Sequence, residues 1–299
     1  MSNFKPGDFK ITSRAMELWK LPKGSTVLDI GCGQGEAVEY LQENYGFKAS
    51  GIDVSTEMIE KGLARNPKLD IKFGDGEFLD DYPSYSFNGV MMECVLSLIN
   101  LPDEALHEVY CVLKKGGKLF ISDLYIKNPK PEFLQALARE AEIQQQTPHS
   151  EGDCSSHNHS DCDEQDCNTC DAGNMSSCDD NCSDCSDCSL DCDHSHDHDH
   201  SHDDHDMGPD SDYYKKEHKK KAVPFRSEGR LAIDPLIEEL KEIGFQNIQW
   251  EDFSIELDNF VAEKMMSGES LEECFFCESL KPEDGYKTGY FLLVAEKPL

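Results

Sequence analysis

The sequence predicts an α/β protein with a mainly parallel seven-stranded sheet and helices on both faces, interrupted by a disordered insert rich in Cys, His and Asp. Two observations predict the sheet: short apolar runs alternate with segments whose apolar residues recur at helical spacing, and a glycine-rich turn follows the first run. A third predicts the insert: one stretch has almost no large apolar residue. With 299 residues, the chain is long enough for one large domain with a full core.

The insert stands out by its charge. Residues 151–212 contain 20 Asp or Glu and no Lys or Arg, so they carry −20 of the formal net charge of −32. They also hold nine of the 14 cysteines. A segment of this composition cannot bury a core. We therefore expect a first part of the globular domain at 1–146, a low-complexity acidic insert with a basic tail at 147–221, and the second part of the domain at 222–299.

The first βαβ unit is expected near the N-terminus. Residues 26–30 form an apolar run that breaks into glycines, and Ala37, Val38 and Leu41 then share one helical face. A second strand ends at Asp53 and is followed by a helix over 55–64. Such a unit is typical of a right-handed crossover between parallel strands.

The alternation continues through the rest of the chain. Gly116 and Gly117 are expected to stop the helix that precedes them. The last strand is expected to insert antiparallel at the sheet edge. The further predicted strands are 69–73, 87–94, 118–124, 248–253 and 290–295, and the further predicted helices are 102–113, 132–146 and 231–243.

Candidate ligand-binding residues follow the first strand. Asp29, Gly31, Gly33 and Gly35 form a D-x-G-x-G-x-G run, in which missing side chains let a ligand touch the main chain. The dinucleotide pattern G-x-G-x-x-G fails because Glu36 occupies its third glycine position. A carboxylate there disfavours a pyrophosphate but suits a sulfonium or an ammonium group. The absence of G-K-[ST] excludes a P-loop.

Two more strands end in acidic residues. Asp53 lies 18 residues beyond Gly35, where a carboxylate can accept hydrogen bonds from both hydroxyls of a ribose. Asp75 ends the third strand, where it can accept from an exocyclic adenine amine. Either Asp alone could be an ordinary helix N-cap. The ordered set of three acidic strand ends after a glycine loop instead predicts a Rossmann-like nucleoside site.

The strings VLDIGCGQG, GIDVS, GDGEF, FNGVMMECVLSLI and LKKGGKLFISDLY resemble the motifs of class I S-adenosylmethionine-dependent methyltransferases. MECVLSL, ISDLY and GYFLLVAEKP are also similar to a smaller family from anaerobic bacteria linked to radical-SAM genes. The resemblance implies that S-adenosylmethionine is the cofactor. It implies these cofactor-binding residues: Asp29, Gly31, Cys32, Gly33, Gly35, Asp53, Val54, Asp75, Gly76, Glu77 and Glu93.

Methyl transfer needs a base only if the acceptor must lose a proton. Glu93 and Asp123, at the ends of the fourth and fifth strands, are the candidates for a base or an acceptor-orienting group. Cys94, Ser97 and Tyr125 are further candidates on the acceptor side. Cys94 and Ser97 are also compatible with simple packing, and Asp123 with capping a turn. We expect a small-molecule or metalloid acceptor, bound by residues 5–19 and the chain after Tyr125. The net charge disfavours nucleic acid.

The insert has the residue types that bind metals. Paired cysteines and alternating histidines suit Zn²⁺, Ni²⁺ or Cu⁺. The candidate ligands are Cys167, Cys170, Cys182, Cys185, Cys188, His194, His196, His198, His200 and His202. An acidic linker without a metal role explains the composition equally well. Cys274 and Cys277 form a C-x-x-C pair, which supplies only half of a zinc site.

Three classes of function stay open at this point. They are a methyltransferase, a metal-storage or metal-delivery protein on a methyltransferase fold with little or no turnover, and a protein of this fold that serves only for interaction. No run approaches the ~20 apolar residues that span a bilayer, and the first residues lack the order of a secretion signal. The sequence therefore predicts a soluble cytoplasmic protein without a membrane partner.

Overall fold

The computed structural model describes residues 5–146, 221–268, 279–280, 282 and 284–299. The ten candidate metal ligands, together with Cys274 and Cys277, lie outside the described residues, so the expectations placed on them stay predictions. Within the described ranges, no helix is both long and apolar enough to cross a membrane.

The order of helices and strands alternates as the sequence predicts. Up to the insert, the elements are α1 (Phe9–Trp19), β1 (Thr26–Ile30), α2 (Glu36–Tyr45), β2 (Lys48–Asp53), α3 (Thr56–Arg65), β3 (Ile71–Phe73), β4 (Phe87–Glu93), α4 (Pro102–Val112), β5 (Leu113–Ile126) and α5 (Pro131–Gln146). After the insert, they are β6 (Arg226–Ser227), β7 (Arg230–Leu231), α7 (Ile233–Ile243), β8 (Gln246–Asp252), α8 (Ser254–Ser267) and β9 (Thr288–Glu296).

The strands form one mixed sheet. Strands β3, β2, β1, β4 and β5 are neighbours in that order and run parallel. Strand β9 pairs antiparallel with β5 on one side and with β8 on the other. The sequence prediction of a mainly parallel sheet with an inserted antiparallel strand is therefore confirmed. Because β5 precedes the insert while β7, β8 and β9 follow it, the two parts of the chain share one sheet.

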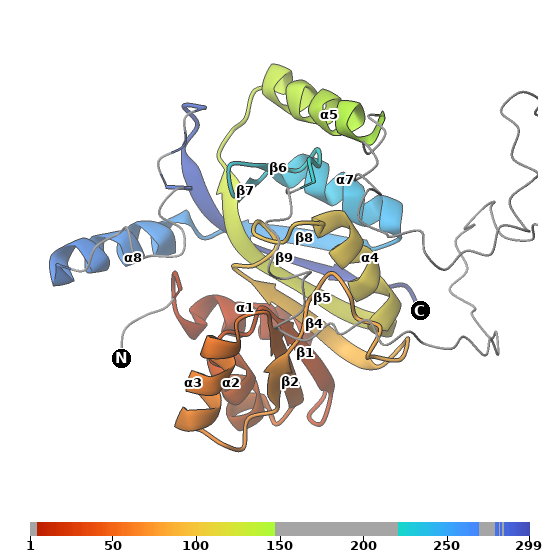
Figure 1. Cartoon of the computed structure of the whole chain (residues 1–299), viewed down its shortest axis with the longest axis vertical. Helices are drawn as coiled ribbons and strands as arrows, with labels where there is room; N and C mark the ends of the chain where they lie inside the picture. The colour runs from red at the N-terminus through yellow and green to blue at the C-terminus, as the bar shows by residue number, and fades with distance from the viewer. Residues whose placement is uncertain (1–4, 147–220, 269–278, 281, 283) are drawn as a thin grey trace, which may run out of the picture. The chain divides into compact units, whose positions relative to one another are not determined.

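Apolar residues cover both faces of this sheet. In β1 the neighbours Val27 and Leu28 are both fully buried but belong to different core clusters, because successive strand residues point to opposite faces. Helices α4 and α7 pack in the cluster of Leu28, and α1, α2, α3 and α8 contribute to the cluster of Val27. Figure 1 shows α4 and α7 on one side of the sheet and α1, α2 and α3 on the other. Helices on both faces agree with the predicted class.

Four elements were not predicted. Helix α1 buries Ile11, Ala15, Met16 and Trp19, whose helical spacing is present in the sequence. Helix α8 has only a weak apolar stripe, and β6 and β7 are too short, at two residues each, to leave a pattern. The predicted sheet of seven strands therefore becomes one of nine strands within the described ranges.

The glycine pair after α4 has a different role from the one predicted. Helix α4 already ends at Val112, and Gly116 and Gly117 lie inside β5. Gly116 has a φ of +74° and donates its N–H to the Lys297 carbonyl over 2.9 Å. The pairing of β4 with β5 shifts register here. The two glycines thus form a bulge at the start of β5.

Candidate active site

The predicted site residues share one edge of the sheet. Ile30 pairs with Ile52 and with Met92, and Asp53 pairs with Phe73. The carboxyl ends of β1, β2, β3 and β4 therefore lie side by side. Strand β1 lies between β2 and β4, where the strand order reverses, and open α/β sheets bind ligands at such a point.

The glycine loop turns sharply between β1 and α2. Gly31, Gly33 and Gly35 have φ values of +73°, +54° and +73°, in the left-handed region that favours glycine. A Cβ on Gly31 would lie 2.6 Å from a Val95 methyl carbon, so packing also requires a glycine there. A Cβ on Gly33 would meet only the Met58 methyl, at 3.6 Å. The main chain at Gly33 is therefore open to a ligand.

Asp53 joins this loop to the end of β2. Its Oδ2 accepts the N–H of Gly33 at 2.8 Å, and its Oδ1 accepts the N–H of Ser55 at 2.8 Å. Each carboxylate oxygen keeps a second acceptor position, so Asp53 can accept two hydroxyl donors as well. Val54 follows with 53% exposure, which places apolar surface next to the carboxylate.

The segment after β3 carries a second acidic group and a second apolar surface. Asp75 Oδ1 accepts the N–H of Glu77 at 2.9 Å, which forms a tight turn. Glu77 is buried, and its Oε1 accepts the N–H of Asn100 at 2.7 Å, so it fixes the approach to α4. Gly76 packs so closely on Ile30 that no Cβ fits. Phe78 is 39% exposed and was not predicted as a site residue.

Two carboxylates lie beneath the loop. Asp29 is 3% exposed, and its carboxylate accepts no hydrogen bond from the described residues. Burial, reinforced by the charge of Glu93 and opposed by Lys5, raises the pKa of Asp29 well above its ordinary value. Glu93 forms an ion pair with Lys5 and accepts the Thr12 hydroxyl at 2.8 Å. Among the described residues, Lys5 is the only positively charged residue that forms an ion pair with either Asp29 or Glu93.

Cysteines at the site pack rather than react. The Cys32 side chain lies against Gly51, where a Cβ would come within 2.7 Å of its sulfur. Burial raises the pKa of the Cys32 thiol, which disfavours the reactive thiolate. Cys94, directly after Glu93, has a φ of +59° and contacts the Tyr290 hydroxyl through its sulfur at 2.8 Å. Burial raises the pKa of Cys94 as well.

Asp123 holds a loop in place. It is fully buried, its Oδ1 accepts the Ser97 hydroxyl at 2.9 Å, and its Oδ2 accepts the Ser97 N–H at 2.9 Å. Oδ1 also accepts the N–H of Leu124 at 2.7 Å. The structure places Asp123 as a positioning residue for the chain after β4, with no surface through which it could reach an acceptor. Ser97 is its partner and is buried with it.

Burial raises the pKa of Asp123 from 3.8 to about 6, although the hydrogen bonds from Ser97 and Leu124 oppose the shift. The folded protein thus holds this proton more tightly than the unfolded chain. The free energy of unfolding should fall by about 2 kcal/mol through this group as the pH rises from 4 to 7. We expect the difference in unfolding free energy between the wild type and Asp123→Asn to change by that amount in denaturant titrations at the two pH values. An unchanged difference would contradict this expectation.

The arrangement has a distinct chemical character. Asp29, Asp53, Asp75 and Glu93 all lie at the ends of neighbouring strands, and Glu36 begins α2, where a pyrophosphate would otherwise approach. Such a site suits a nucleoside with free ribose hydroxyls and a cationic group. The Asp29 carboxylate, which accepts no hydrogen bond from the residues that the structure describes, and the open main chain of Gly33 are the two features that a bound ligand would complete. The residues present therefore fit S-adenosylmethionine.

Comparison with known proteins gives the same assignment over the first part of the chain. A 2-methyl-6-phytyl-1,4-hydroquinone methyltransferase of Synechocystis sp. is 34% identical over 119 residues, which cover 36% of this chain and 36% of that protein. An 18S rRNA (guanine(1575)-N(7))-methyltransferase of Saccharomyces cerevisiae is 32% identical over 130 residues, 40% of this chain and 47% of that protein. The chain therefore spans less than half the length of these two relatives.

Solved structures agree at the level of the fold. The Haemonchus contortus phosphoethanolamine N-methyltransferase 2 in complex with S-adenosyl-L-methionine matches with a TM-score of 0.57 at 15% identity, covering 99% of this chain and 54% of that one. The narrower resemblance to methyltransferases of anaerobic bacteria stays a prediction. The profile of the family described as "Methyltransferase domain" matches residues 21–197. The chain belongs to this family, within the class I S-adenosylmethionine-dependent methyltransferases.

Proposed function

We propose that the protein transfers a methyl group from S-adenosylmethionine to a small-molecule acceptor. The observation that carries the proposal is the carboxyl edge of β1, β2 and β4. There, the buried carboxylate of Asp29 lacks a hydrogen-bond donor among the described residues, and the adjacent loop leaves open space at Gly33. A cationic nucleoside would fill both positions.

Each end of the cofactor has matching groups in the chain. Asp53 would accept the ribose hydroxyls through the acceptor positions left after its bonds to Gly33 and Ser55. Val54 and Phe78 would supply apolar surface for the adenine, and Asp75, three positions before Phe78, would serve as an acceptor. Asp29 would face the ammonium of the amino-acid end. The cofactor supplies a methyl group on a sulfonium, which makes that carbon electrophilic.

Glu93 acts through its charge. Lys5 and Thr12 each donate to one of its oxygens, and its side chain is only 7% exposed. A carboxylate held in this way is fixed in place, which suits positioning the N-terminal segment and attracting a sulfonium better than abstracting a proton. We therefore assign Glu93 a positioning role.

A small acceptor agrees with the size of a pocket near the site and with the net charge of the protein. A pocket of about 580 Å³ opens at the end of β5, on the same edge as the cofactor residues. This volume suits a small molecule. The formal net charge is −32, of which −12 remains outside residues 151–212, so a nucleic-acid backbone is a disfavoured partner.

The proposal is tested by supplying purified protein with S-adenosylmethionine labelled on its methyl group and a fractionated cell extract, under anaerobic conditions. We expect the label to appear in a low-molecular-weight product. Label found only on protein or RNA would overturn the small-molecule acceptor, and no transfer to any fraction would count against the enzymatic activity itself.

We propose in addition that the insert binds metal ions, because of the number of its Cys and His residues. Full-length protein loaded with Zn²⁺ and then dialysed should retain several ions per chain, and deletion of 151–212 should remove them. Asp53→Ala should leave the metal content unchanged. Equal metal content with and without the insert would contradict this proposal. The deletion variant should still bind the cofactor, which separates the insert from the methyltransferase site.

A metalloid acceptor would require several thiolates close together. The described residues include three cysteines, Cys32, Cys94 and Cys111. No group of three or more metal-binding side chains occurs among the described residues. The alternative of a metalloid substrate, like that of a metal-delivery protein, therefore rests on cysteines outside them.

A further inference from the structure

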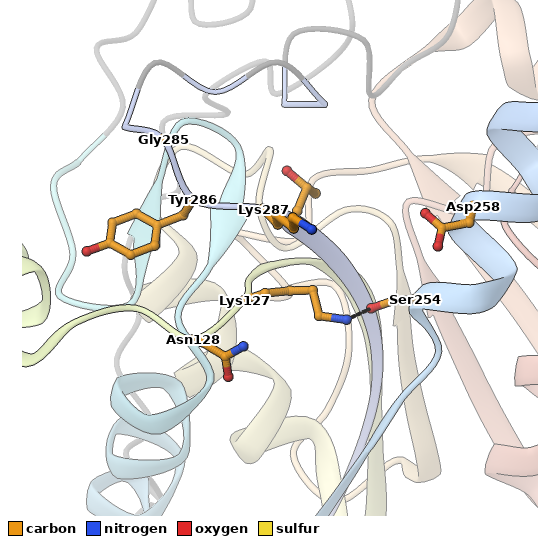
Figure 2. A pocket seen from close by; sticks show the side chains of 8 residues that line it. Lys127, Asn128, Ser254, Asp258, Gly285, Tyr286 and Lys287 are labelled. Carbon is orange, nitrogen blue, oxygen red and sulfur yellow. Dashed lines mark hydrogen bonds between the residues drawn. The ribbon is translucent and has the colours of Figure 1, made fainter.

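The pocket at the end of β5 is separate from the cofactor residues. Figure 2 shows the side chains around it. They are Lys127, Asn128, Ser254, Asp258, Gly285, Tyr286, Lys287 and Thr288. They belong to three segments that are far apart in the sequence: the chain after β5, the first turns of α8, and the chain that leads into β9.

Strand pairing places this pocket on the edge where methyl transfer is proposed. Strand β5 is parallel to β4, so Lys127 leaves the sheet on the same edge as Glu93. Thr288 pairs with Ile126 in the antiparallel β5–β9 ladder and therefore begins β9 at that edge. Ser254 begins α8 directly after β8, which runs antiparallel to β9 and so ends there too.

One tyrosine links the pocket to the residue after Glu93. The Ser254 hydroxyl, which lines the pocket, accepts the N–H of Tyr290 at 3.3 Å. The hydroxyl of the same Tyr290 contacts the Cys94 sulfur at 2.8 Å. The pocket and the carboxyl end of β4 are thus separated by the length of a single buried side chain. The pocket therefore lies near the residue that follows Glu93.

The charges around the pocket have opposite signs on different walls. Lys127 lies on the β5 wall, where its ammonium donates to Asp252 at 3.2 Å and to Ser254 at 3.0 Å. Lys287 lies on the neighbouring β9 side. Asp258 projects from α8, across from Lys127 in Figure 2. Neither Lys287 nor Asp258 has a side-chain hydrogen bond or ion pair with the described residues. Two charged side chains of opposite sign therefore stay available to a ligand.

We propose that this pocket binds the zwitterionic end of the acceptor, a carboxylate or phosphate against Lys127 and Lys287 and an amine against Asp258. This inference rests on the proposed methyltransferase function and adds a substrate class to it. A purely anionic ligand would leave Asp258 as a repulsive neighbour, and a purely cationic one would face two ammonium groups. A zwitterion can pair its anionic group with the lysines and its amine with Asp258. The pocket volume of about 580 Å³ is large enough for such a molecule.

The test uses the full-length chain saturated with S-adenosylhomocysteine and small charged probes, followed by ligand-detected NMR titration. Glycine and O-phosphoethanolamine serve as zwitterions, acetate and inorganic phosphate as the matched anions, and ethylamine as the cation. We expect each zwitterion to bind about tenfold or more tightly than its matched anion and than ethylamine. Lys287→Gln and Asp258→Asn should each weaken zwitterion binding about threefold or more.

Matched controls are Lys241→Gln and Asp234→Asn on α7, which do not line the pocket and should leave binding unchanged. Anions that bind as well as zwitterions, together with tighter anion binding by Asp258→Asn, would overturn the inference. So would the failure of both zwitterions to bind at millimolar concentration. Binding of S-adenosylhomocysteine is measured on the same samples. If it is normal while zwitterions fail, only the pocket assignment falls; if it is absent, the proposed function falls first.

Discussion

Asp53→Ala is expected to weaken the binding of S-adenosylmethionine and S-adenosylhomocysteine at least about 100-fold. The substitution removes the carboxylate proposed to accept both ribose hydroxyls. Hydrogen bonds to a charged group contribute about 1.5–3 kcal/mol each, so the loss of two gives a change of this size or larger. It also removes the acceptor for the N–H groups of Gly33 and Ser55, which hold the loop in shape. Isothermal titration calorimetry measures the effect.

The control for this substitution is Asp80→Ala, an exposed carboxylate after β3 outside the proposed cofactor residues. It should bind both ligands as the wild type does. Thermal unfolding of Asp53→Ala shows whether the variant is folded when binding is measured. A folded Asp53→Ala protein with wild-type affinity would remove Asp53 from the site and with it the proposed orientation of the nucleoside.

Alanine at Gly33 and alanine at Gly31 should separate binding from stability. Gly33→Ala carries a left-handed backbone cost of about 1–2 kcal/mol, but its methyl would meet only Met58 at 3.6 Å. The protein should fold, and cofactor affinity should fall about tenfold or more because the methyl fills the space beside the loop. Gly31→Ala carries the same backbone cost plus a 2.6 Å clash with Val95, so it should lose about 2–5 kcal/mol of stability.

Denaturant unfolding and calorimetry on the two variants distinguish these effects. If Gly33→Ala binds the cofactor like the wild type, the open space beside Gly33 is not part of the binding site. If Gly31→Ala is as stable as Gly33→Ala, the packing of Val95 on the loop contributes less than the geometry indicates. The first result would contradict the proposed role of Gly33 in binding, and the second would contradict the proposed role of Gly31 in packing.

Local patterns were sufficient to predict the parallel part of the sheet. In β1, β4 and β5 the buried pairs Val27 and Leu28, Met91 and Met92, and Phe120 and Ile121 make continuous apolar runs, as strands covered on both faces require. Helix α8 could not be predicted because it buries few residues, such as Leu257 and Phe260, and so has no clear apolar stripe in the sequence. Strands of two residues, such as β6 and β7, have no periodicity to detect.

The places of the candidate site residues in the fold could be predicted where these residues follow strands in order. Asp29, Asp53 and Glu93 could be placed from sequence because the carboxyl ends of parallel strands share one edge. Lys5 and Thr12 belong to the segment 5–19 that we expect to bind the acceptor. Their contact with Glu93 could not be predicted, since they lie more than 80 positions before it and carry no motif. Lys5 has no local signal at all, whereas the polar Thr12 within the apolar face of α1 was the one available hint.

The role of individual carboxylates needed the structure. Asp123 has the position expected of a catalytic base at a strand end, yet its oxygens are occupied by Ser97 and Leu124 inside the core. Glu77 likewise follows Asp75 in sequence but turns toward the start of α4. Sequence order identifies the strand end, while hydrogen bonding decides which acidic side chain faces the ligand.

Calorimetric titration of the full-length protein with S-adenosylmethionine and with S-adenosylhomocysteine tests the assignment most directly. We expect one site per chain with a dissociation constant on the order of micromolar for both ligands, together with a rise in the thermal unfolding temperature. Folded protein that shows neither binding heat nor thermal protection with either compound would contradict it.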